Sequence, residues 1–367
     1  MFKSPFTSST SKPGQGKITL SILSPCTPVL SELCYQYPLK LVAPDPVPPR
    51  SLSQSGSNTL NINGKKESHS SSVGSAHDPH PPPLVHTIFL LTYGGGIVAG
   101  DTVDLHIRLS PDTRLNLLTQ GSTKIFKTPD PLLISHQHME VDLHPGAALL
   151  YLPDPVQPFR ESAFVQKNVV RFVGYGDDGG YNLCICDWVS GGRGARGENW
   201  DFWSYESRNE IWGVPSSTPD DEKAGKKKRL LLRDNLLLHP SVLPAHQSQP
   251  YTIYATLILH GPLFSPLANH FLDEFTLLPR LGSRNWDSDQ IPPELSVKEK
   301  RRKERQEKEK RDGLIWSAAK VRDGFTLVKL ACPGEAGVES ARSWLKDMIL
   351  EEGSVVESFG ERGVMCL

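Results

Sequence analysis

Two histidines one residue apart, His136 and His138, form the pattern in this sequence that is most typical of a metal site. On a strand both imidazoles project from the same face, and imidazole is a good ligand for divalent transition metals. A metal site of the cupin type would add a glutamate three or four residues after the second histidine, but Glu140 comes earlier and Asp142 is the shorter acid. The pair therefore leaves a β-scaffold metalloenzyme open as an alternative hypothesis, with the metal unknown.

Cysteines offer a second candidate. Cys184 and Cys186 are spaced to share one face of a strand within the apolar segment 181–190. Free cysteine is commonly buried, so core packing is the first interpretation and soft-metal binding the second. The sequence has no Gly-x-Ser-x-Gly elbow and no other nucleophile–base signature. We therefore expect no catalytic residues and no enzymatic turnover.

The segment 93–101 is rich in glycine and fits two nucleotide-binding patterns in part. Gly95 and Gly100 have the spacing of a phosphate-binding loop, but an aspartate stands where a lysine is needed and would repel phosphate. A dinucleotide fingerprint must open a helix, whereas 102–109 alternates between polar and apolar residues as a strand does. Both nucleotide interpretations therefore fail, and the residues predict a tight glycine turn between strands at 85–92 and 102–109.

Four blocks follow one another along the chain: Gly94–Asp101, Thr119–Phe126, Gly146-Ala147 with Tyr151–Pro155, and Gly192–Glu198. In order and spacing they resemble the signature blocks of the UreD (UreH) family of urease accessory proteins, and the resemblance covers about residues 17 to 350. The chain departs from the family pattern at two positions of the first block, where a glycine replaces proline and an alanine replaces glycine. It also lacks the Pro-Arg-x-Trp ending of bacterial members.

The resemblance implies a non-catalytic scaffold required for nickel insertion into apo-urease. The partners it implies are apo-urease, a UreF-like accessory protein and, through that protein, a UreG-like GTPase, with no nucleic acid and no membrane. It further implies no tightly bound cofactor and a transient passage of Ni²⁺ through the interior. Carboxylates, carbonyls and water suit such a passage because they release the ion again. A β interaction module without a role in nickel delivery stays open as a further alternative.

Two acids in the family blocks, Asp101 and Glu198, are the candidate groups for this nickel route. Alternatively, Asp101 caps the glycine turn and Glu198 pairs with an arginine of its own block. Gln120 and Lys124 are expected to satisfy buried backbone groups or an ion pair rather than to contact a partner. The motif residues singled out are Gly94, Gly95, Gly96, Gly100, Gln120, Gly121, Lys124, Arg193 and Arg196.

The elements that must position these residues are mainly strands. Short segments with period-two alternation and turn formers between them run from about residue 17 to 260 and again over 314–331. Two helices are predicted, at 266–278 and 335–352. Because no β–helix–β alternation occurs, the predicted fold is mainly β. We expect a large two-layer, β-helix-like or sandwich architecture of many short strands, with a small helical element near the C-terminal third.

Low-complexity stretches surround and interrupt one predicted domain over 17–367. Residues 1–16 are expected to form a disordered tail, and 45–83, 215–229 and 284–313 are expected to be disordered insertions. The last of these has a charged end with nine basic and five acidic side chains, which also fits a solvent-exposed helix.

Composition excludes several classes of function. The 40 Lys and Arg balance 41 Asp and Glu, so the net charge does not favour nucleic acid or an anionic membrane as a partner. No apolar run reaches the roughly 18 residues that cross a bilayer. The first residues lack the apolar core of a secretory signal. Six cysteines are few for a secreted disulfide scaffold, and a cytoplasmic location is expected.

Overall fold

The computed structural model describes residues 12–23, 27–48, 84–176, 180–215, 227–239, 250–278 and 296–367. Most of the predicted tail and most of the predicted insertions 45–83 and 215–229 lie outside these residues, as does the first part of the third insertion, 284–295. Two predicted boundaries are wrong where the structure does describe them. Strand β1 already begins at Gln15, inside the predicted tail, and strand β15 begins at Arg229, inside a predicted insertion.

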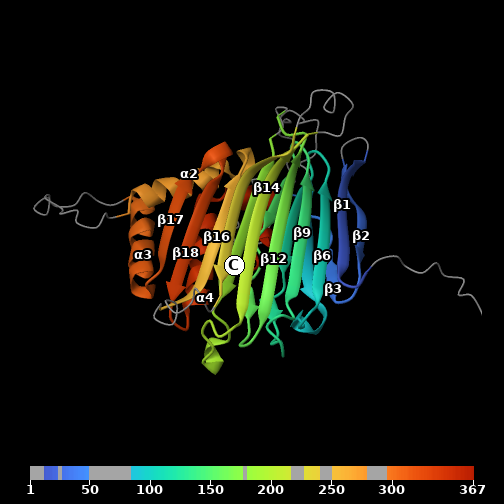
Figure 1. The fold of residues 1–367 in the computed structure, drawn as a ribbon. Coiled ribbons are helices and arrows are strands. Elements are labelled where there is room, and N and C mark those ends of the chain that lie inside the picture. The colour runs from blue at the N-terminus through green and yellow to red at the C-terminus, as the bar shows by residue number, and fades with distance from the viewer. Residues whose placement is uncertain are drawn as a thin grey trace, which may run out of the picture.

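Two large sheets make up most of the fold (Figure 1). The seven-stranded sheet has the order β15 (Arg229–Leu238), β14 (Ser204–Val214), β12 (Ala163–Val173), β9 (Ser135–Leu143), β6 (Thr102–Leu109), β1 (Gln15–Leu23) and β2 (Thr27–Tyr35). The eight-stranded sheet has the order β17 (Ile315–Lys320), β18 (Thr326–Pro333), β16 (Tyr251–His260), β13 (Asn182–Ser190), β10 (Ala148–Tyr151), β7 (Arg114–Thr119), β4 (Val85–Thr92) and β3 (Leu39–Val42).

A third, short sheet joins the two large ones. It consists of β5 (Gly96–Ile97), β8 (Lys124–Ile125) and β11 (Gln157–Pro158), which pair in parallel. The chain therefore winds through one strand of each sheet in turn, as β4–β5–β6, then β7–β8–β9, then β10–β11–β12. Equivalent strands of successive turns pair in parallel, and antiparallel strands such as β2 and β15 complete the edges. The predicted mainly β, two-layer and β-helix-like architecture is confirmed.

Alternating side chains place the core between the two large sheets. In β6, Val103, Leu105, Ile107 and Leu109 are buried, as the period-two pattern predicts. Strand β13 is buried along its whole length because both of its faces are covered. Its odd-numbered residues face the seven-stranded sheet, and its even-numbered residues face a layer of helices.

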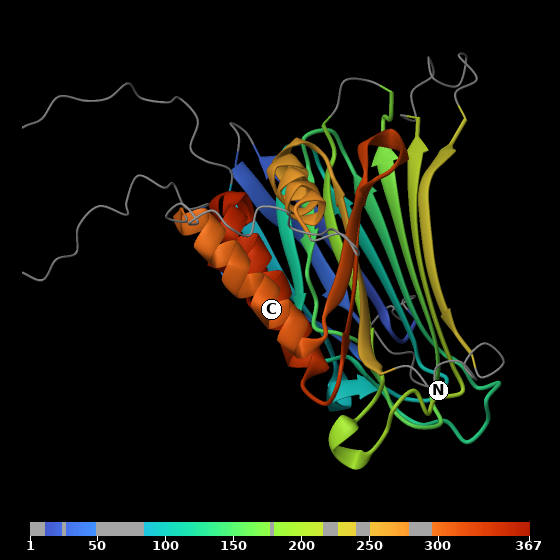
Figure 2. The same cartoon turned by 90° about the vertical axis from the view of Figure 1, so that its left-hand side faces the viewer.

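That layer of helices lies on the outer face of the eight-stranded sheet (Figure 2). Helices α2 (Ser265–Thr276) and α4 (Gly337–Glu352) confirm the two predicted helices. The chain then continues into α5 (Ser354–Phe359) and the 3₁₀ turn η7 (Glu361–Val364), which sequence reasoning did not predict. Phe271 of α2 and Trp344 of α4 bury their rings in the same aromatic cluster, with centroids 6.0 Å apart.

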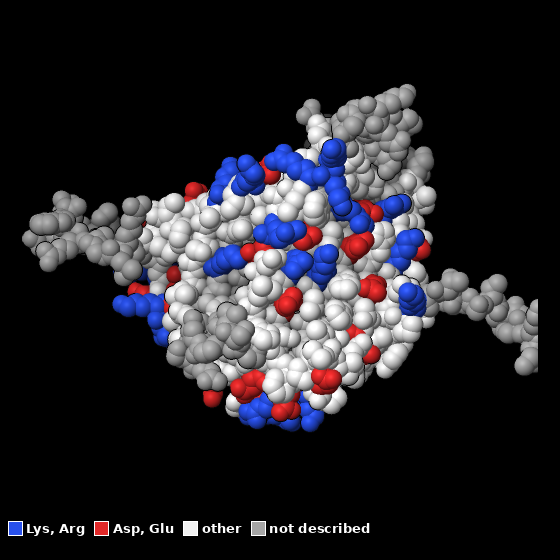
Figure 3. All heavy atoms as spheres, viewed as in Figure 1, with Lys and Arg blue, Asp and Glu red and all other residues white. Residues whose placement is uncertain are grey.

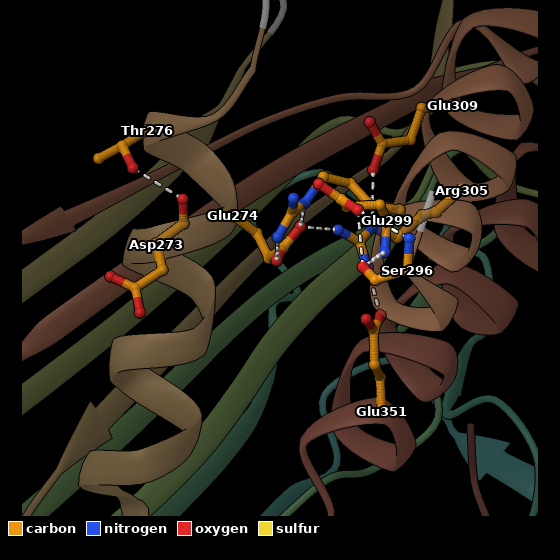
Figure 4. Close-up of polar contacts among 9 residues, drawn as sticks. Asp273, Glu274, Thr276, Ser296, Glu299, Arg305, Glu309 and Glu351 are labelled. Atoms are coloured by element: carbon orange, nitrogen blue, oxygen red, sulfur yellow. Dashed lines mark hydrogen bonds and ion pairs between the residues drawn. The ribbon is translucent and has the colours of Figure 1, made fainter. Parts of the chain in front are cut away.

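The charged part of the predicted insertion 284–313 is an ordered helix, α3 (Val297–Asp312), so the prediction of disorder is wrong there. A capping box formed by Ser296 and Glu299 begins α3, and Gly313 in the left-handed region ends it. Arg305 is buried and forms ion pairs with Glu274 of α2 and Glu351 of α4 (Figure 4). These long-range ion pairs hold a helix that has almost no apolar side chains.

Candidate functional site

A buried aspartate, Asp187 of β13, lies at the centre of a polar cluster between the two large sheets. Asn209 Nδ2 donates to Asp187 Oδ2 at 2.6 Å, and Ser207 Oγ donates to the same oxygen. Gln166 Nε2 donates to Asp187 Oδ1 at 3.2 Å. Burying a carboxylate is costly unless hydrogen bonds satisfy it, and three donors from the opposite sheet do so here.

The strand register explains why these polar groups meet. Gln166 of β12 lies between Gln137 of β9 and Ser207 of β14, and all three point inward. In the next inward row, Asn168 faces Asn209, and its Nδ2 donates to Asn209 Oδ1 at 2.9 Å. We call the set Gln137, Gln166, Asn168, Asp187, Ser207 and Asn209 the polar file. It crosses an otherwise apolar core.

The polar file contains oxygen atoms that could accept further hydrogen bonds or bind a cation. Burial raises the pKa of Asp187, while hydrogen bonds from Ser207 and Asn209 act in the opposite direction. Asn168 Oδ1 is buried and has no hydrogen-bond partner among the described residues. The side-chain ligand atoms that the file offers are carboxylate, amide and hydroxyl oxygens, which bind a divalent cation weakly enough to release it.

A cavity lies at each end of the polar file. One, of about 320 Å³, is lined by Asp187, Asn235 and Lys329 among others, and Lys329 Nζ pairs with Asp234 at 2.6 Å. The other, of about 60 Å³, is lined by Gln137 and by the segment 119–123. The second cavity therefore lies between Gln137, at one end of the polar file, and the second family block.

The first, second and fourth family blocks and the segment that follows Tyr151–Pro155 lie side by side in the fold, whereas Gly146-Ala147 lies at the other end of β10, where Gly146 N donates to Gly180 O. Gly96 pairs with Lys124 across β5 and β8, and Lys124 pairs with Gln157 across β8 and β11. Gln157 Nε2 in turn donates to Gly192 O at 3.2 Å. We call the segments 93–101, 120–134, 157–162 and 191–203 together the motif edge. The 3₁₀ turn η3 (Gly194–Arg196) projects from it at the lower end of the molecule in Figures 1 and 2.

The glycine block forms the turn that the sequence predicts. Gly94, Gly95 and Gly100 have φ between 75° and 78°, the left-handed region that favours glycine. Gly96 is extended, and a Cβ there would lie 2.5 Å from Lys124 O, so glycine is needed for close approach of the next turn of chain.

Asp101 and Glu198, the two candidate acids, lie on the motif edge and are already engaged. Asp101 Oδ2 accepts from Val98 N at 3.4 Å within the glycine turn. Glu198 is buried and forms a bidentate pair with Arg193, whose Nε lies 2.9 Å from Oε2. Hydrogen bonds from Arg193 lower the pKa of Glu198 and outweigh its burial. Asp101 therefore caps the glycine turn and Glu198 pairs with an arginine of its own block, which are the structural alternatives to a place on the nickel route.

Gln120 and Lys124 are exposed, and neither satisfies a buried group among the described residues, so that expectation is wrong. The buried acceptor that faces their block is instead Asp154 of the third block. Its Oδ2 accepts from Gly121 N at 2.8 Å and from Thr119 Oγ1 at 3.1 Å, and its Oδ1 pairs with Arg342 of α4 at 2.8 Å. This aspartate ties the second block to the helical layer.

His136 and His138 lie on the outer face of the seven-stranded sheet, where cations and acids are interspersed (Figure 3). Their ring centroids are 5.7 Å apart, and His138 Nδ1 lies 3.1 Å from Asp104 Oδ1. Among the described residues, no third His, Cys, Asp or Glu joins them in a group that could hold a metal ion. Cys184 and Cys186 are both fully buried beneath the helices, in agreement with core packing.

Sequence reasoning missed Asp187, Gln166 and Asn168. One signal was present, because Asp187 is the single charged residue within the apolar run 183–189. The partners that make it a site come from β12 and β14, and the sequence does not show which residues of those strands face it.

Comparison with known proteins gives the same family as the four blocks. The family model described as "UreD urease accessory protein" matches residues 51–354. The chain belongs to this family. Among relatives, it is 30% identical to Urease accessory protein 4 of Cryptococcus neoformans var. grubii over 95% of this chain and 93% of that protein. It is 28% identical to an uncharacterized UreD-like urease accessory protein of Schizosaccharomyces pombe, over 74% of this chain and 83% of the relative. Urease accessory protein D of Arabidopsis thaliana is 32% identical over 47% of this chain and 54% of its own length.

Membership of the UreD family assigns the chain a role in urease maturation. It acts as an accessory protein and not as an enzyme, in line with the names of its relatives. Within the described part of this UreD-family chain, no helix is both long and apolar enough to cross a membrane.

Proposed function

We propose that this UreD-family protein is a non-catalytic scaffold for nickel insertion into apo-urease, and that Ni²⁺ passes along the polar file. The proposed partners are a UreF-like accessory protein, a UreG-like GTPase bound through it, and apo-urease itself. The observation that carries the proposal is the position of Asp187, a buried carboxylate in a polar file that has a cavity at each end.

The chemistry of the polar file supports transport over storage. A bare divalent cation cannot enter an apolar core, because the loss of its hydration is too costly. Carboxylate, amide and hydroxyl oxygens replace part of that hydration, and a single carboxylate leaves the ion free to move on. A closed cage of thiolates or imidazoles would retain it instead. Ni²⁺ is thus the cargo of the scaffold.

Asp187 replaces Asp101 and Glu198 as the proposed acid of the route. The carboxylate of Glu198 is occupied by Arg193, and that of Asp101 faces the glycine turn. Within the described ranges, the side-chain donors to Asp187 are all neutral, so an approaching cation does not have to displace an arginine. We place this activity in the cytoplasm, a location supported by the free state of the five described cysteines.

The test uses cells in which this chain is deleted and then restored as the native protein or as Asp187→Asn. Nickel per urease is measured on purified urease, at equal amounts of the accessory protein. We expect Asp187→Asn to lower nickel content and urease activity on the order of tenfold, since it removes the one buried charge of the file. Asp273→Asn, which alters an exposed acid on α2, outside the motif edge, serves as the control. Full nickel content with Asp187→Asn contradicts the route, and full nickel content in the deletion strain contradicts the role in insertion.

A further inference from the structure

A lysine lies across the larger cavity from the buried acid of the polar file. Lys329 of β18, Thr256 of β16 and Asp187 of β13 are direct neighbours in register and form one row across three strands. Neighbouring strands are about 4.8 Å apart, so the Cα atoms of Lys329 and Asp187 are about 10 Å apart. Lysine has a flexible four-carbon stem, and its ammonium can therefore reach the carboxylate of Asp187 from this position.

This lysine is a potential competitor of the cation. Of the described residues that line the cavity, only Asp187 is a carboxylic acid and only Lys329 is a base. An ammonium and a divalent cation compete for the same carboxylate, because both are attracted to its negative charge. If Lys329 paired with Asp187, the polar file would have no free acid.

A second acid holds Lys329 away from Asp187. Lys329 Nζ lies 2.6 Å from Oδ1 of Asp234, which belongs to β15 at the edge of the opposite sheet. Asp234 is the register partner of Asn209, and Asn209 donates to Asp187 Oδ2 at 2.6 Å. The side chain of Lys329 is 52% exposed and that of Asp234 is 14% exposed, whereas Asp187 is buried. The ion pair therefore lies on the solvent side of the buried acid.

The two charges of this ion pair act on Asp187 in opposite directions. Burial is the main cause that raises the pKa of Asp187, and the charge of Asp234 raises it further, whereas the charge of Lys329 lowers it. Both charges are thus close enough to affect the carboxylate, and each offsets the other. Without Asp234, the positive charge of Lys329 would act on the route uncompensated.

We propose that Asp234 is a positioning residue of the nickel route, which holds Lys329 toward solvent and so keeps the carboxylate of Asp187 free for the cation. The inference rests on the proposed function, since it matters only if Ni²⁺ passes Asp187. The alternative role of the ion pair is to attach β15 to the opposite sheet. Attachment alone would make the loss of either partner equivalent, whereas positioning makes only the loss of Asp234 harmful.

The test uses the deletion strain restored with Asp234→Asn, with Lys329→Met or with both changes, and nickel per urease is measured at equal amounts of the accessory protein. Asp323→Asn is the matched control. The side chain of Asp323 is also 14% exposed and also binds β15, through Arg229 at 2.9 Å, but it does not line the cavity. Melting curves check that each variant is folded.

We expect Asp234→Asn to lower nickel content on the order of tenfold, because the freed ammonium pairs with Asp187 and repels the cation. Lys329→Met should not cause this loss, and the double variant should recover nickel content to within about twofold of Lys329→Met. The control should deliver nickel as the native chain does.

A second measurement needs no metal. Burial of a carboxylate without a cationic partner is costly, so Asp187→Asn should raise the melting midpoint of the native chain at pH 7. It should not raise the midpoint of Asp234→Asn, because Lys329 has become the partner of Asp187 there. Thermal melts of the four proteins measure this difference.

The inference is overturned if Asp234→Asn delivers nickel within about twofold of the native chain, if the double variant is no better than Asp234→Asn, or if the control loses nickel equally. An equal rise in midpoint from Asp187→Asn in both backgrounds also overturns it. Full nickel content with Asp187→Asn contradicts the route and this inference together. A loss with Asp187→Asn and none with Asp234→Asn contradicts this inference alone, so the two failures are distinguishable.

Discussion

Asn209 of β14 donates a 2.6 Å hydrogen bond to Asp187 of β13, across the interface between the two large sheets. The two residues belong to different sheets, and the carboxylate of Asp187 lies within a core that is otherwise mainly apolar. A buried carboxylate lowers stability, and residues of this kind are found at functional sites, in line with the proposed role of Asp187.

Replacement of Asp187 by asparagine should therefore raise stability near neutral pH. Burial raises the pKa of Asp187 in the folded state, so folding opposes its ionisation. The contribution of Asp187 to stability falls as the pH rises from 3.8 through the folded pKa, and it stays low above that value. We expect Asp187→Asn to melt about 2 °C higher than the native chain at pH 7, with a gap that closes as the pH falls toward 3.8. Thermal melts across this pH range measure the gap, and a lower midpoint for the variant at pH 7 contradicts the expectation.

A second prediction concerns the pair that ties the second family block to α4. Asp154→Ala removes the acceptor for Gly121 N and Thr119 Oγ1 and leaves Arg342 without its buried partner, so a loss of about 3 kcal/mol in unfolding free energy is expected. A double-mutant cycle with Arg342→Ala should give a coupling energy of about 1–2 kcal/mol. Glu339→Ala is the control, because Glu339 is 75% exposed and 3.9 Å from the same arginine. Coupling of Arg342 to Glu339 as strong as its coupling to Asp154 would disprove this assignment.

A third prediction concerns acid. Burial alone would raise the pKa of Glu274, but Arg302 and Arg305 outweigh burial and lower the pKa to about 2. A lowered pKa stabilises the fold above the ordinary value of 4.5, and the stabilisation is lost as the pH falls from 4.5 toward 2. Denaturant unfolding of the native chain should therefore lose about 2–3 kcal/mol over this window relative to Glu274→Gln. Burial raises the pKa of Glu309 and the charge of Glu274 adds to that shift, so Glu274→Gln also lowers the pKa of Glu309. Parallel pH profiles for the two proteins would rule out the effect.

A fourth prediction separates two glycines of the motif edge. Gly96→Ala should destabilise the fold by about 2 kcal/mol, because the new Cβ would lie 2.5 Å from Lys124 O and the backbone of β8 must shift. Gly194→Ala meets open space and needs no special φ, so its unfolding free energy should stay within about 0.5 kcal/mol of the native value. Chemical denaturation measures both, and equal losses would show that close approach is not what requires Gly96.

The sequence by itself determined the strand-rich fold class, the helices α2 and α4, the glycine turn and the family. Each of these follows from local information, since alternation sets which side of a strand is buried and signature blocks are contiguous residues. The family model matches residues 51–354, and all four blocks lie within that range.

The helix α3 shows where local information ends. Its 16 residues from Val297 to Asp312 lack an apolar face, so the sequence allowed either an exposed helix or disorder. The tertiary structure decided in favour of an ordered helix, because Glu274 and Glu351 pair with Arg305 from helices 31 and 46 residues away.

The polar file and the motif edge also depend on the tertiary structure. Asp187 becomes a site only because the register of β12 and β14 brings Gln166, Ser207 and Asn209 to it from the other sheet. Strand register between sheets is set by packing over the whole core, which no short stretch of sequence encodes. For the same reason, the sequence alone did not show that Asp101 caps a turn and that Glu198 pairs with an arginine. The burial of Asp187 likewise depends on the packing of the two sheets.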